Sequence, residues 1–147
     1  MEIDSKNFDS GESLVDGYVG IEKIDPIERL KQHEITKILW QSLCEKGIRE
    51  GDKGRIKAFL FSNLYEHAKE LEAQFKGEFE VVIFKEDEGS EYIIEITTPV
   101  CRLSNEALEE VADILMISAA DTNTKFDGFE LDVNEVKKLN KPWWRIW

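Results

Sequence analysis

The fold is decided by two β-prone runs in the middle of the chain, Phe79-Glu-Val-Val-Ile-Phe84 and Tyr92-Ile-Ile-Glu-Ile-Thr-Thr98. Both are rich in β-branched and aromatic residues, which favour extended backbone. The residues between them, Lys85-Glu-Asp-Glu-Gly-Ser90, are polar, contain a glycine and have the character of a hairpin connection. The sequence therefore predicts that these two strands pair antiparallel.

A strand and a helix are predicted before this hairpin, and a helix and a strand are predicted after it. Before it, Arg55–Phe61 alternates as a strand and Leu64–Lys76 has the apolar spacing of a helix. After it, Ser104 caps a predicted helix from Asn105 to about Asp121, and Thr124–Val133 is extended. The order βαββαβ is that of the ferredoxin-like sandwich, a four-stranded antiparallel sheet with two helices on one face. We therefore predict an α+β fold of this type.

An additional N-terminal helix is expected before the first strand. Asp25 followed by Pro26 is a typical helix start, and Gly47 suits the residue after the last turn, so the helix should run to about Lys46. Apolar residues recur along it at three- and four-residue steps, which predicts that one face of the helix is core. These residues are Ile27, Leu30, Ile35, Ile38, Leu39 and Leu43.

The length and composition indicate one folded domain with extensions. The chain has 147 residues, 41% of them hydrophobic, which is enough for a single core. We expect residues 1–24 to form an acidic, loosely ordered arm, residues 25–133 to form a single α+β domain, and residues 134–147 to form a basic and aromatic tail.

The charge balance excludes some classes of partner. Asp and Glu number 31 against 19 Lys and Arg, a net charge of −12, which has the wrong sign for binding phosphates. We therefore expect no direct nucleic-acid binding and favour a basic protein partner. No apolar run approaches the ~18–20 residues that cross a bilayer, and the acidic N-terminus lacks the features of a signal peptide. These features predict a cytoplasmic protein without membrane contact.

Catalytic and cofactor motifs are not apparent in the sequence. His33-Glu34 begins like a zinc-protease motif, but position 37 is lysine instead of the second histidine. Cys44 and Cys101 have no CxxC partner, so we expect reduced, buried thiols. We predict a non-enzyme with no cofactor and no metal. A small metal-dependent hydrolase built around His67 and Glu70 stays open as a less favoured alternative.

The most distinctive motif is Phe126-Asp-Gly-Phe-Glu130, in which Asp-Gly permits a bulge with Gly128 at positive φ. Together with Leu103-Ser104 and the acidic helix that follows, this motif resembles the RraB family, protein regulators that bind ribonuclease E and lower its activity. The similarity spans about residues 50–133 and includes Gly51-Asp52 and Phe59-Leu-Phe61. The resemblance implies a ferredoxin-like bacterial cytoplasmic protein that acts by protein–protein contact, without catalysis or cofactor.

These observations lead to a non-catalytic regulator that inhibits a ribonuclease through an acidic surface. The alternative is an immunity-like or antitoxin-like protein that neutralises another basic enzyme on the same scaffold. The tryptophans near the C-terminus either cover the core or anchor a partner. The residues predicted to bind the partner come from the acidic helix, the aromatic motif and the C-terminal tail: Glu106, Glu109, Glu110, Asp113, Phe126, Asp127, Gly128, Phe129, Glu130, Trp143 and Trp144.

Overall fold

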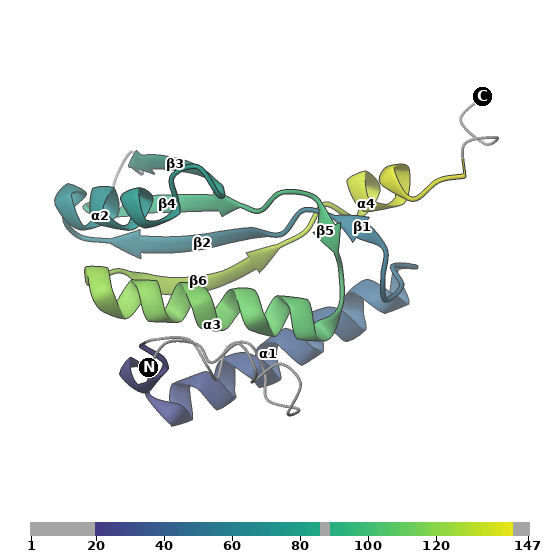
Figure 1. The fold of residues 1–147 in the computed structure, drawn as a ribbon, viewed down its shortest axis with the longest axis horizontal. Helices are drawn as coiled ribbons and strands as arrows, with labels where there is room; N and C mark the ends of the chain where they lie inside the picture. Colours follow the sequence, from purple (N-terminus) through teal and green to yellow (C-terminus); the bar gives the residue numbers. More distant parts are fainter. Residues whose placement is uncertain (1–19, 86–88, 143–147) are drawn as a thin grey trace.

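A four-stranded antiparallel sheet forms the centre of the structure (Figure 1). The structure is a computed structural model, and it describes residues 20–85 and 89–142. The strands lie in the order β3-β4-β2-β6. Their bounds are β2 (Lys57–Ser62), β3 (Glu80–Lys85), β4 (Tyr92–Thr97) and β6 (Lys125–Glu130). The expected hairpin is confirmed, because β3 and β4 pair antiparallel from Glu80 opposite Thr97 to Lys85 opposite Tyr92.

Two helices cover one face of this sheet and bury its main core. α2 (Tyr65–Phe75) connects β2 to β3, and α3 (Asn105–Thr122) leads from the β4 side of the sheet to β6. Both helices contact the sheet and each other. The α+β fold is thus as predicted, and its strand order is consistent with the ferredoxin-like arrangement.

Alternation along β2 explains which side chains face the helices. Ala58 and Leu60 are buried, whereas Phe59 and Phe61 point to the other face, as the period-two pattern predicts. The expected cap of α3 is also present, since the backbone N–H of Ala107 donates a 2.9 Å hydrogen bond to Ser104 Oγ. The main core includes Ala58, Leu60, Ala68, Leu71, Phe75, Ile94, Ile96, Leu115 and Ala119.

A second cluster of buried residues, which includes Leu43, Ile56, Leu103 and Val136, lies beside two short strands and a short helix that the sequence analysis did not predict. β1 (Lys53–Gly54) pairs with β5 (Cys101–Arg102), and α4 (Val133–Leu139) packs beside β1. Gly54 is required at this contact, because a Cβ there would lie 2.7 Å from Leu103 Cδ1 and 2.9 Å from Val136 Cγ2. Val136 is fully buried, so the folded domain continues past the expected boundary at residue 133.

The folded region also begins earlier than expected. Ile21–Lys23 forms a short 3₁₀ helix, η3, and Ile24 behind it is buried. Lys23 forms an ion pair with Asp121 at the end of α3. Residues 20–24 therefore pack on α3 and do not form part of a loose arm.

The N-terminal helix α1 (Pro26–Glu45) is present. The prediction that its apolar face belongs to the core is wrong for most of that face. It packs on α3, away from the sheet, and Figure 1 shows it crossing beneath that helix. Of the six apolar residues expected to face the core, Leu43 is buried and Leu39 is half-buried. The other four are mainly exposed, at 62% for Ile27, 67% for Leu30, 58% for Ile35 and 65% for Ile38.

A buried ion cluster explains this orientation of α1. Asp113 of α3 is only 1% exposed, and Arg29 holds it with two hydrogen bonds, from Nε to Oδ1 at 3.1 Å and from Nη2 to Oδ2 at 3.0 Å. His33 Nε2 lies 3.0 Å from the same Oδ1, and because a carboxylate only accepts, the proton is on Nε2. Turning the apolar residues inward would leave this buried carboxylate without its partners.

Removal of the Asp113 carboxylate should destabilise the fold. We expect Asp113→Ala to lower the free energy of unfolding by roughly 3 kcal/mol, because Arg29 loses this buried counter-charge and His33 loses this hydrogen-bond acceptor. Chemical denaturation at neutral pH measures this loss. Glu28→Ala removes the exposed contact to Lys31 and should stay within about 0.5 kcal/mol of the wild type. A loss for Asp113→Ala as small as that of this control would contradict the role of the cluster.

Candidate protein-binding surface

The sheet face opposite α2 and α3, here called the open face, consists of side chains that are exposed or half-buried. The strand registers arrange these side chains in three rows across the sheet. The first row holds Phe84, Ile93, Phe61 and Lys125, the second holds Val82, Glu95, Phe59 and Gly128, and the third holds Glu80, Thr97, Lys57 and Glu130. The open face therefore changes from apolar at one end to charged at the other.

The apolar part of the open face is accessible to a partner. On the edge strand β3, Val82 is 53% exposed and Phe84 is 42% exposed. Beside it, Ile93 on β4 and Phe59 and Phe61 on β2 are half-buried. Clusters of accessible aromatic and aliphatic side chains of this kind are typical of protein-interaction sites. Aromatic residues are also enriched where interfaces gain most of their affinity.

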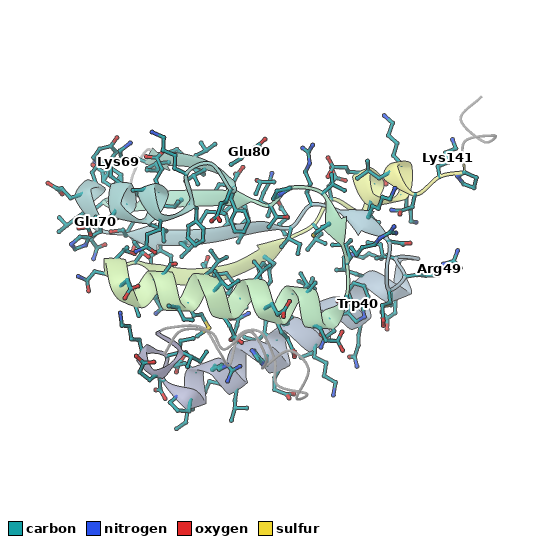
Figure 2. The ribbon with its side chains drawn as sticks, viewed as in Figure 1. Trp40, Arg49, Lys69, Glu70, Glu80 and Lys141 are labelled. Carbon is teal, nitrogen blue, oxygen red and sulfur yellow. The ribbon has the colours of Figure 1, made fainter. Side chains whose placement is uncertain are left out.

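The charged end of the open face is hollowed and mainly acidic. A cavity of about 570 Å³ lies between the sheet and the start of α4. Its lining has five carboxylates, from Glu80, Glu95, Glu130, Asp132 and Glu135, against the two cations Arg55 and Lys57. Lys57 Nζ is 3.6 Å from Glu95 Oε2, which neutralises one of the carboxylates. Figure 2 shows Glu80 at the β3 edge of the sheet, pointing away from the body of the protein.

The predicted aromatic motif folds as a bulge on β6, and its two rings pack on the core side of the sheet instead of the open face. Phe59 pairs with Gly128 and Leu60 with Phe126, so Asp127 is the extra residue of the bulge. Gly128 has φ = 134°, as the motif predicts. Because of the bulge, Phe126 and Phe129 both turn toward the helices and pack edge to face, with ring centroids 5.2 Å apart. Of the motif, Asp127 and Glu130 are the exposed side chains.

The predicted acidic face of α3 is smaller than the sequence indicates. Glu106 is exposed, and Glu109 and Glu110 are half-buried, but Asp113 is buried beneath α1 and is unavailable to a partner. Burial, reinforced by the charges of Asp113 and Glu106, raises the pKa of Glu110. Trp143 and Trp144 lie outside the described residues.

The residues considered for metal or thiol chemistry do not form a site in the described part of the chain. Within residues 20–85 and 89–142, no group of three or more His, Cys, Asp or Glu side chains is placed to hold a metal ion. His67 is half-buried and Glu70 is exposed on α2. The prediction of buried thiols is wrong for Cys44, which is exposed. Cys101 is half-buried, and this burial raises the pKa of its thiol. No helix among the described residues is both long and apolar enough to span a membrane.

Comparison with known proteins does not identify a family for this chain. No family model matches the sequence, and no curated protein is significantly similar to it. The function of the open face is therefore inferred from its own side chains. The period-two pattern of β2 separates Phe59 and Phe61 from the buried residues Ala58 and Leu60, but the sequence analysis does not identify Glu80, Val82 and Phe84 as their neighbours. The signal for these three was the same alternation along β3, which the register with β4 aligns with β2.

The bulge glycine should be intolerant of a side chain. A Cβ at Gly128 would meet no atom within 4 Å, so the cost of Gly128→Ala comes from the backbone at φ = 134°. We expect a loss of about 1–3 kcal/mol in the free energy of unfolding, measured by chemical denaturation. Lys125→Ala on the same strand is exposed and should cost less than about 0.5 kcal/mol. Equal stability of the two variants would show that the bulge is not strained by a Cβ.

The raised pKa of Glu110 predicts a pH-dependent gain in stability on its neutralisation. A carboxyl whose pKa is raised by folding disfavours the folded state at pH values above its ordinary value of 4.5. Glu110→Gln should therefore stabilise the protein at pH 7, by about 0.3 kcal/mol after solvent screening. The gain should shrink as the pH falls and vanish well below pH 4.5, where Glu110 is protonated in both the folded and the unfolded state. Thermal unfolding across this pH range tests the prediction, and a gain that persists at low pH contradicts it.

Proposed function

We propose that this protein is a non-catalytic regulator that binds a basic protein partner through the open face of its sheet. The observation that carries the proposal is the gradient across the three rows. Phe61, Phe84 and Ile93 offer accessible apolar surface at one end, and the carboxylates around the hollow offer negative charge at the other. An apolar contact area with a charged rim is the usual composition of a protein interface.

The charges on the open face favour a protein over a nucleic acid. Aromatic side chains on a sheet bind single-stranded nucleic acid when cations beside them contact the phosphates. Here carboxylates outnumber cations in the three rows. Glu80 and Glu130 lie at the two ends of the third row and have no cation opposite them in the sheet other than Lys57, which also contacts Glu95. The remaining cation, Lys125, lies at the edge of the first row. These carboxylates repel phosphate and attract lysine and arginine side chains, so they suit a cationic protein surface.

The class of partner is proposed from the resemblance to the RraB family. The RNA-binding region of a ribonuclease is a cationic surface that also contacts bases, so it complements both ends of the open face. A regulator bound there would compete with RNA and lower the activity of the nuclease. A ferredoxin-like domain of this kind would act in the bacterial cytoplasm, and the exposed acid Glu106 on α3 would add to the attraction.

Binding to ribonuclease E and its dependence on salt test this function. We expect binding at low salt that weakens as salt rises, because rim charges are screened. Glu80→Lys/Glu130→Lys should slow association about tenfold, and Phe84→Ala should weaken affinity about tenfold. Surface plasmon resonance separates the two effects.

The matched control reverses two exposed acids on α2, on the other side of the sheet. Glu66→Lys/Glu70→Lys changes the net charge by the same amount but leaves the open face intact. It should bind at nearly the wild-type rate. An equal loss for both double variants would show that only net charge matters, and the open face would be excluded. No binding at low salt would exclude ribonuclease E as the partner.

A further inference from the structure

The outer surface of α1 carries an aliphatic stripe that the proposed function does not use. Ile27, Leu30, Ile35 and Ile38 are each at least 58% exposed. They lie on the side of the helix away from Arg29 and His33, which hold α1 to α3 through Asp113. The ion cluster thus fixes which side of α1 faces outward, and that side carries these four aliphatic residues.

One positive and one negative side chain lie within this aliphatic stripe, so its two ends along the helix differ in charge. Lys31 and Glu34 are exposed and stand between Ile27 and Ile38, with spacings of four, three and four residues. Positions at these spacings follow one seam along a helix, as in a coiled coil. Lys31 Nζ lies 3.7 Å from Glu28 Oε2, but both side chains are exposed and such a contact contributes little. Lys31 is therefore able to exchange this partner at small cost.

The seam is complementary to itself when it is read in the opposite direction. In an antiparallel pair of α1 helices, Ile27 packs against Ile38 of the second copy, and Lys31 lies opposite Glu34 of the second copy. A two-fold axis repeats both contacts, as an isologous interface requires. In a parallel pair, each lysine would face a lysine and each glutamate a glutamate, which is repulsive. The charges therefore favour the antiparallel arrangement.

We propose that the exposed face of α1 is a homodimer interface in which two α1 helices pair antiparallel through this seam. Leu30 and Ile35 flank the seam on its two sides and extend the apolar contact. Figure 1 shows α1 beyond α3, on the outside of the molecule. The open face lies on the other side of the sheet, so the dimer leaves both copies of it accessible. This proposal does not depend on the proposed function.

The interface predicts a weak and concentration-dependent dimer. One helix pair buries less than the roughly 1,200 Å² of a standard interface, so we expect a micromolar dissociation constant. Sedimentation velocity of the full chain from about 1 µM to about 500 µM should show conversion from monomer to dimer. A monomer over this whole range would overturn the proposal.

A charge exchange tests the register of the helices. Lys31→Glu places two glutamates opposite each other, and Glu34→Lys does the same with lysines, so each variant alone should dissociate at least about tenfold more readily. An equimolar mixture of the two variants restores opposite charges and should dimerise like the wild type. Circular dichroism checks that α1 stays helical in each variant. A mixture that stays monomeric while the wild type dimerises would exclude this register.

Two aspartate substitutions distinguish this interface from dimerisation through the sheet. Ile38→Asp should abolish the dimer, whereas Val82→Asp, at another exposed position on the open face, should leave it intact. The opposite result would place the interface on the open face and overturn the assignment to α1.

Discussion

The structure depends on one buried carboxylate. Asp113 on α3 is bound by two hydrogen bonds from Arg29 and one contact from His33, and this cluster lies between α1 and α3. A buried charge of this kind is costly when unpaired, so it selects the single orientation of α1 that brings both partners to it. Arg29 and His33 face inward, Leu39 and Leu43 pack into the second buried cluster, and the side of α1 that carries four large aliphatic residues faces solvent. A polar interaction thus leaves four aliphatic side chains outside the core, where an amphipathic helix would usually bury them.

The sheet separates two surfaces for which we propose different roles. Alternation along β2, β3 and β4 sends one set of apolar residues under α2 and α3 and a second set to the open face. The first set makes the core, and the second remains accessible without being needed for folding of the helices onto the sheet. Surface apolar residues that do not serve the core are available for recognition. The helical layer is separately available for self-association, because α1 lies on the side of α3 away from the sheet.

Most of the secondary structure was predictable because its signals are local. The hairpin between β3 and β4, the caps at Asp25 and Ser104 and the bulge at Gly128 all follow from residue types a few positions apart. The orientation of α1 was not predictable, because periodicity locates an apolar stripe without showing what it contacts. Asp113 looked like one more exposed acid, and its partner Arg29 is 84 residues away. β1, β5 and α4 are short and depend on the close approach at Gly54, for which the sequence has no periodic signal.

The distribution of charge also differs from what a count of residues suggests. Asp113 is buried and paired inside the fold, and Glu109 Oε2 lies 3.8 Å from His33 Nδ1 in the same cluster. The surface of α3 therefore presents less negative charge than its sequence implies. The carboxylates around the hollow at the end of the open face are opposed by Arg55 and Lys57, of which Lys57 already contacts Glu95. A cationic partner attracted by the net charge of −12 would therefore find carboxylates beside accessible aromatic side chains at the sheet. Long-range attraction and short-range packing coincide there, which is why the open face, rather than α3, is the stronger candidate for recognition.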